Sequence, residues 1–379
     1  IPWPMVVAIV LAALALVLVL GAQAGTRRSA WMAVPIALLV VTGLIVPGEL
    51  PRVLLLEAAA FGAVAMLARS GTDRRATVAY LSAAVLSTLT LVAGTVLLPD
   101  APAGLVLALL LTGFAIKLAL IPAYLWLPVL AERTPAALVG LVVAVVDVAA
   151  FAELIDLRQQ APWLFAPAWP WLVLAVASAL LGAGLALAQA NIRRMLAFST
   201  ISGAGFLVLG IAVGGSYGIE GAAAAAAADA LSKALLFSAV AAAEGDRTTL
   251  TLSDRGIARR HPLALAGFLV GALATFGVPF TAGFSGHWRI YAGALSAGWP
   301  LLVVLIVATI GSILAYVRVI ALVWWGGKPG EPPVPPDRPR AVSVWASEAR
   351  PIVLAIAGLI VAVIVLGIVP GLLQEWTIR

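Results

Sequence analysis

A lysine lies in the middle of an otherwise apolar segment of the chain. Lys117 stands within LVLALLLTGFAIKLALIPAYLWLPVL, and Pro122 follows it five residues later. An ammonium group at the centre of a bilayer costs about 2.5–3.5 kcal/mol on insertion scales, so it requires a partner, water or a function. A proline break frees backbone groups that can hold water. A buried lysine beside such a break indicates a path for an ion or a proton.

A similar combination occurs a second time, in reverse order. In TFGVPFTAGFSGHW, Pro279 precedes His287 by eight residues. Interrupted segments at corresponding positions in two halves of a chain are typical of inverted repeats with a site near the bilayer midplane. A histidine suits proton exchange there, because its unperturbed pKa is ~6.5. We therefore predict helix breaks at Pro122 and Pro279.

Other ionisable residues also fall within apolar segments. Glu57 and Asp147 are each surrounded by small and aliphatic side chains. Asp229 and Lys233 are four residues apart with the acid first, which is the favourable orientation for an ion pair on one helix face. For this pair, and for Lys117, a purely structural role is the alternative interpretation.

The composition excludes most other classes of protein. The chain has 379 residues, of which 63% are hydrophobic and 11% charged, with a mean hydropathy of +1.11. Soluble domains do not have this balance, and repeated apolar runs of this length indicate transmembrane helices. With no cysteine, disulfides, iron–sulfur clusters and thiolate metal sites are excluded. We expect no metal, no cofactor, no catalytic centre in this chain and no nucleic-acid partner.

We predict an all-α polytopic membrane protein with twelve transmembrane spans. The tenth is too long for one crossing, and it breaks at Pro279. The first has no basic segment ahead of it and no clear cleavage site, so it is interpreted as a retained helix. By residue number, the predicted spans are 3–21, 31–47, 52–68, 77–98, 104–128, 136–154, 168–190, 195–214, 217–243, 262–296, 298–325 and 351–372.

The distribution of basic residues predicts the orientation of these spans. Odd-numbered loops hold 16 of the 23 lysines and arginines, whereas the even-numbered loops and the termini hold only Arg52, Arg158 and Arg379. The remaining four lie within spans. Because cytoplasmic loops carry an excess of Lys and Arg, the odd loops should be cytoplasmic and both termini should face away from the cytoplasm.

Four motifs in the middle of the chain resemble those of a known family. They fall in the family's order and spacing over about residues 50–325, and they resemble the antiporter-like membrane subunits of respiratory complex I, membrane-bound hydrogenases and Mrp-type cation/proton antiporters. The motifs are FAIKLALIPAYLWLPVLAERTPAALVGLVVAVVD, NIRRMLAFSTISGAGFLVLG, DALSKALLFSAVAA and GVPFTAGFSGHWRIYAGAL.

The resemblance implies two inverted five-helix repeats, each with one broken helix, around a central axis of charged residues that carries protons. The chain then divides into an N-terminal helix (1–30), a first repeat (31–160), a second repeat (161–325), and a Pro-rich cytoplasmic connector with a C-terminal transmembrane helix (326–379). Family members commonly have fourteen spans. This chain is expected to lack two at its N-terminus, an even number that preserves orientation.

Three residues match the family's motifs directly. Glu57 matches the glutamate that faces the lysine of the first broken helix, and Lys117 matches that lysine. Lys233 matches the lysine of the H-x-x-x-K motif in the second repeat.

Four positions depart from the family's pattern. Asp147 stands where the family usually has a lysine, and Asp229 stands where many members have a histidine. His287 replaces the lysine of the second broken helix, and Tyr124 replaces a histidine that some members have after the proline.

The favoured hypothesis is a proton-translocating subunit of a multi-subunit complex in a bacterial-type cytoplasmic membrane. Its partners would be other membrane subunits, lipid and protons, with sodium left open as a second cation. Whether the complex is a redox-driven oxidoreductase is also left open. The alternatives are a structural subunit that has lost conduction and, less favoured, a free-standing solute transporter. The expected proton path consists of Glu57, Lys117, Asp147, Asp229, Lys233 and His287.

Overall fold

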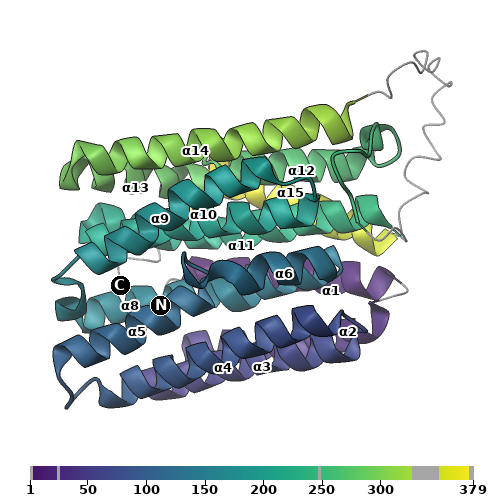
Figure 1. Ribbon diagram of the computed structural model, residues 1–379. Coiled ribbons are helices and arrows are strands. Elements are labelled where there is room, and N and C mark those ends of the chain that lie inside the picture. The colour runs from purple at the N-terminus through teal and green to yellow at the C-terminus, as the bar shows by residue number, and fades with distance from the viewer. Residues whose placement is uncertain (1–2, 24–25, 246–248, 327–349, 375–379) are drawn as a thin grey trace.

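The computed structural model describes residues 3–23, 26–245, 249–326 and 350–374. Every regular element in these ranges is a helix, and the one strand-like contact is an isolated bridge between Asn191 and Thr251. The long helices run roughly side by side and form one elongated bundle (Figure 1). The predicted all-α class is confirmed.

The helices of the first half run from α1 to α8. The segment α7 continues through a π turn (Val142–Val146) into α8, so the three form one span. The bounds are α1 (Trp3–Ala22), α2 (Arg27–Ile45), α3 (Glu49–Arg69), α4 (Arg74–Leu97), α5 (Ala103–Lys117), α6 (Trp126–Arg133), α7 (Ala136–Leu141) and α8 (Asp147–Gln160).

The helices of the second half run from α9 to α16. Here a π turn (Ile320–Trp324) follows α14. In both halves, therefore, the helix after the broken span contains a π turn. The bounds are α9 (Trp169–Ala188), α10 (Ile192–Val213), α11 (Gly215–Glu244), α12 (Pro262–Thr275), α13 (Gly283–Ala297), α14 (Trp299–Val319), α15 (Arg350–Ile368) and α16 (Gly371–Gln374).

The span count agrees with the sequence. Ten helices of the described ranges are long and apolar enough to cross a membrane. The other two predicted spans are the broken ones, α5 with α6 and α12 with α13. In each half, three continuous helices (α2–α4 and α9–α11) precede the broken span and a helix with a π turn follows it. This order agrees with two five-span repeats, whose boundaries stay a prediction.

Several predicted helix ends differ from the structure by three to six residues, and two of these differences affect the charged residues. The third span begins at Glu49 and not at residue 52, so Arg52, which was counted as a loop residue, is buried within α3. The sixth span ends at Gln160 and not at residue 154. Its polar end, AELIDLRQQ, stays helical because Glu153 and Asp156 are buried beside cations on neighbouring helices.

Some of the residues on which the predicted orientation depends lie outside the described ranges. They are the Pro-rich connector over 327–349 and five of the basic residues: Arg247, Lys328, Arg338, Arg340 and Arg379. The described part of the connector between α11 and α12, residues 249–261, is folded against the bundle. There Ile192 N donates to Leu250 O at 3.0 Å, and Arg255 Nη1 donates to Leu322 O at 2.9 Å.

The centre of the bundle is formed by α11 and by the span α7–α8. Nearly every residue of both is buried, although both carry several acids. Helix α11 packs against α1, α7, α8, α10, α12, α13 and α15. In contrast, α4 and α14 expose many large apolar side chains, as helices that face lipid do.

Both helix breaks have the same local design. After α5, Ala119 is left-handed (φ 51°) and Leu120 N donates to Ala115 O at 2.8 Å. After α12, Gly277 is left-handed (φ 64°) and Val278 N donates to Leu273 O at 3.0 Å. A left-handed residue followed by a bond that reaches back five residues is a Schellman cap. Each cap closes the helix just before its proline.

Candidate functional site

Lys117 is the last residue of α5, and its ammonium group lies between two carboxylates. Nζ contacts Glu57 Oε1 from α3 and lies 3.5 Å from Glu153 Oε2 on α8. Thr88 of α4 donates its hydroxyl to the other oxygen of Glu57. The three charged residues are 2–6% exposed. Removing such groups from water costs several kcal/mol per ion, so the two acids are what permit the lysine here.

Sequence reasoning predicted Glu57 in this site and missed Glu153. The predicted end of the sixth span at residue 154 placed Glu153 at the membrane edge. In a helix, six residues turn about 600°, so Asp147 and Glu153 face directions about 120° apart. The spacing of acids along DVAAFAELID was therefore an available signal that this helix presents carboxylates to two sides.

The break after α5 leaves Lys117 at a helix end whose backbone groups are satisfied by other helices. Ile121 N donates to Ser178 Oγ of α9 at 2.9 Å, and Trp126 Nε1 donates to Ile116 O at 2.8 Å. Pro122 lies within this turn, as predicted. Tyr124, which follows, packs against Phe198 and is not part of the ion cluster.

Asp147 is near both buried lysines, Lys117 in the first half of the chain and Lys233 in the second. It is the first residue of α8, directly after the π turn, and it is buried. It lies within electrostatic range of Lys233 and of Lys117. An acid within range of two buried cations offsets their positive charge, whereas a lysine in the same place would add to it.

Asp229 and Lys233 form the ion pair that their spacing predicts. Lys233 Nζ lies 2.5 Å from Asp229 Oδ2, and both belong to α11. A small cavity beside the pair is also lined by Ser199, Thr275 and Tyr316. Ser199 Oγ and Tyr316 Oη are 3.1 Å apart, so hydroxyl groups continue the polar region beyond the pair.

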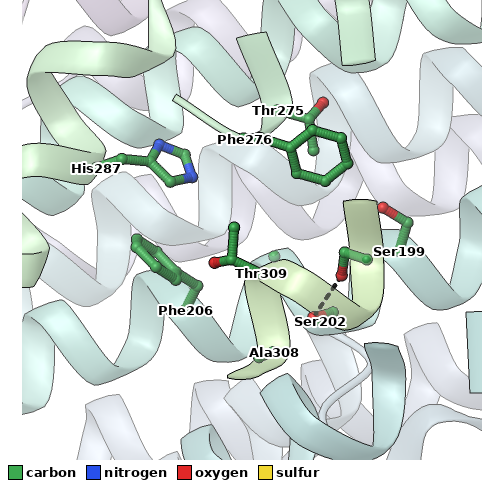
Figure 2. Close-up of a pocket in the computed structure, with 10 residues that line it drawn as sticks. Ser199, Ser202, Phe206, Thr275, Phe276, His287, Ala308 and Thr309 are labelled. Carbon is green, nitrogen blue, oxygen red and sulfur yellow. Dashed lines mark hydrogen bonds between the residues drawn. The ribbon is translucent and has the colours of Figure 1, made fainter. Parts of the chain in front are cut away.

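His287 lies on α13, beside a second and larger cavity. This cavity has a volume of about 30 Å³ and shares Ser199 and Thr275 with the first. A cavity of this size has room for a water molecule, and its hydroxyl groups could hold one. Figure 2 shows His287 at one side of the cavity and Ser199 and Ser202 at the other. The polar lining thus runs from Lys233 to His287.

The second helix break fixes the histidine in place. His287 Nδ1 lies 3.0 Å from Gly283 O, and its ring stacks on Phe206 at 4.6 Å between centroids. A Cβ at Gly277 would come within 2.5 Å of His287 Cβ, and Gly277 has a positive φ. Only glycine meets both conditions, so the turn before Pro279 and the histidine are packed as one unit.

Two basic residues within predicted spans lie apart from this site. Arg289 pairs with Glu220 of α11, and Arg318 donates to the backbone oxygens of Leu187 and Gln189 at the end of α9. Among the residues that the structure describes, no group of three or more His, Asp or Glu side chains is placed to hold a metal ion.

Comparison with known proteins links this geometry to one family. The family model described as "NADH:quinone oxidoreductase/Mrp antiporter, TM" matches residues 57–313. NADH-quinone oxidoreductase subunit N of Desulforudis audaxviator is 32% identical over 269 residues, covering 68% of this chain and 54% of that protein. Subunit N of Salinispora arenicola is 33% identical, with coverages of 70% and 50%. The chain spans about half the length of these relatives.

Solved structures agree with the fold. A chain of respiratory complex I from Thermus thermophilus, with bound aureothin, has a TM-score of 0.77 and 27% identity, covering 99% of this chain and 86% of that one. A chain of the Mrp complex from Dietzia sp. has a TM-score of 0.81 at 19% identity, with coverages of 98% and 82%. At 19% identity, the likeness to the Mrp chain shows a common fold only.

The two carboxylates around Lys117 predict a non-additive effect on stability. Glu57→Gln and Glu153→Gln should each lower the free energy of unfolding by about 1–2 kcal/mol, because the ammonium keeps one acid. The double variant leaves the ammonium unpaired, so its cost should reach about 3–5 kcal/mol and exceed the sum of the singles. Thermal unfolding in detergent measures this, with the half-exposed Glu132→Gln as control. Simple additivity would contradict a shared ion site.

Proposed function

This chain belongs to the NADH:quinone oxidoreductase/Mrp antiporter transmembrane family, and from that premise we propose that it is a proton-translocating subunit of a larger membrane complex. One observation carries the proposal. Buried ionisable side chains follow one another from Lys117 through Asp147 to Lys233, and a polar cavity continues to His287. Ionisable residues in membrane spans are costly, and they mark ion and proton paths.

In this proposal, each group takes a proton from its neighbour and passes it on. Lys117 exchanges a proton at the end of the first broken helix, where Glu57 compensates its charge. Asp147 relays it towards α11, and the Asp229–Lys233 pair receives it. Water held between Ser199 and His287 completes the path to the second broken helix.

The proposed partners are other membrane subunits. A path of side chains supplies no energy by itself, so a partner or an opposing ion gradient must drive the proton. The relatives are named as a subunit of an NADH-quinone oxidoreductase, and the structural neighbours belong to respiratory complex I and to an Mrp complex. These names support assembly into a complex of that kind.

A structural subunit that has lost conduction is the second candidate. Both buried lysines already have carboxylate partners, which is also what static ion pairs require. A free-standing solute transporter is disfavoured, because a cavity of about 30 Å³ beside His287 suits water and not a larger solute. Removal of a single proton carrier distinguishes the first two candidates.

We also propose the cytoplasmic membrane of a bacterial-type cell, with both termini on the non-cytoplasmic side. The sequence has no cysteine, so a single introduced thiol reports its own position. Asp100→Cys, between α4 and α5, should react with a membrane-impermeant maleimide in intact cells. Arg74→Cys, at the start of α4, should react only after the membrane is opened. The reverse pattern of labelling would mean that the orientation is inverted.

Lys117→Ala should abolish proton translocation while the complex still assembles. Without the ammonium group, Glu57 and Glu153 can take up protons and become neutral, so the fold is retained but the carrier is lost. Proton uptake into vesicles measures transport, and a native gel measures assembly. Arg194→Ala, which opens a half-exposed ion pair, is the control and should transport normally. Normal transport by assembled Lys117→Ala would favour the structural subunit.

His287 tests the far end of the path. His287→Lys restores the family residue but in water holds its proton about 4 pKa units more tightly, so transport should persist with an optimum at higher pH. His287→Phe keeps a ring that can stack on Phe206 but cannot carry a proton, and transport should be lost. Proton uptake as a function of pH measures both variants. One common profile for the wild type and both variants would place His287 outside the path.

A further inference from the structure

A second group of buried charges lies on α3 and α8, outside the path described above. Arg52 is 6% exposed, and its Nη1 lies 2.5 Å from Asp156 Oδ2 and 3.6 Å from Glu49 Oε1. Its Nε is buried without a hydrogen-bond partner. Burying an arginine is expensive even when it is paired, so this position requires an explanation.

This group leads directly from the Lys117 site to one end of the bundle. Glu153 contacts Lys117, and Asp156 is three residues further along α8, on nearly the same face and about 4.5 Å along the axis. Glu49 is the first residue of α3 and is in electrostatic range of both Glu153 and Asp156. Its side chain is 20% exposed, whereas the side chains of Arg52 and Asp156 are 7% and 10% exposed. Charged groups thus continue from the buried Lys117 site to the partly exposed start of α3.

A row of carboxylates between a proton carrier and a membrane face would be a leak. Lys117 can give a proton from Nζ to Glu153 Oε2, which leaves a neutral amine and a neutral carboxylic acid and conserves charge. From there, Asp156 and Glu49 are the next acceptors towards the face where α3 begins. Arg52 lies among these acceptors, held by both. A fixed guanidinium charge in a narrow path is an electrostatic barrier to protons.

We propose that Glu153 is a second proton acceptor for Lys117, and that Arg52, fixed by Asp156 and Glu49, is the charged seal of a side branch to the face where α3 begins. The proposal rests on the proposed role of Lys117 as a proton carrier. In this proposal Arg52 keeps protons on Lys117 from reaching the membrane face where α3 begins. Glu153 accepts a proton as well as compensating the charge of Lys117.

The seal is tested by passive proton leak in liposomes that contain the purified membrane complex with this chain. A potassium diffusion potential drives protons, and an internal pH dye reports them. Arg52→Gln should raise the leak about tenfold over wild type, which corresponds to ~1.4 kcal/mol. Arg52→Lys keeps the charge and should stay tight. Arg158→Gln, at the same end of α8 but half-buried, is the matched control and should also stay tight.

A double variant identifies the route of the leak. Arg52→Gln with Glu153→Gln should return the leak to the wild-type rate, because the first acceptor is gone. A leak that persists in the double variant would mean that loosened packing carries it, and would overturn the proposal. An unchanged rate in assembled Arg52→Gln would overturn it as well.

The proton leak of Asp156→Asn and the driven transport of Lys117→Ala complete the test. If Arg52→Gln does not assemble, Asp156→Asn leaves Arg52 in place but removes its closest anchor, and a wild-type leak in that variant would overturn the seal. Failure of the proposed function has a different signature, which is normal driven transport by Lys117→Ala. A tight Arg52→Gln together with an inactive Lys117→Ala rejects the seal alone.

Discussion

Buried ammonium groups require buried carboxylates, and the arrangement of this bundle follows from that requirement. Lys117 draws acids from α3 and α8, so three spans must meet at the end of α5. Lys233 has an acid on its own helix and lies within range of Asp147 across the helix contact. Because the cost of an unpaired charge is several kcal/mol, α11 and α7–α8 are held at the centre, where these charges are shared.

The broken helices solve a second problem, which is access. A continuous helix satisfies its own backbone and offers no polar surface at the membrane midplane. Here two Schellman caps end α5 and α12 inside the bundle, one directly after Lys117 and the other beside His287. Freed backbone groups are taken up by Ser178 and Trp126 at the first break. The two breaks therefore position the two ends of the proposed path.

The departures that the resemblance to the family implies are compatible with one another. The resemblance implies that Asp147 stands in the place of a lysine and Asp229 in the place of a histidine. An acid at position 147, within electrostatic range of Lys117 and Lys233, lowers the positive charge at the centre, and Asp229 lies directly beside Lys233. His287 is shorter than the lysine that the resemblance implies for this position, and the adjoining cavity, with hydroxyl groups in its lining, has room for the water that would extend its reach.

Sequence alone determined the class of fold, the twelve spans, the two breaks and the Asp229–Lys233 pair, because hydropathy, proline and helical spacing are local properties. The pairing of Glu57 with Lys117 came from family resemblance. The spacing of acids in α8 indicates carboxylates on two sides of that helix, but it does not place Glu153 beside Lys117, and nothing in the sequence shows that Arg52 is buried. A polar helix end looks like a membrane edge until its partners are known. Glu153 lies 36 residues from Lys117 in the chain, and Asp156 lies 104 residues from Arg52. Only the tertiary structure decides whether such charges meet each other or meet water.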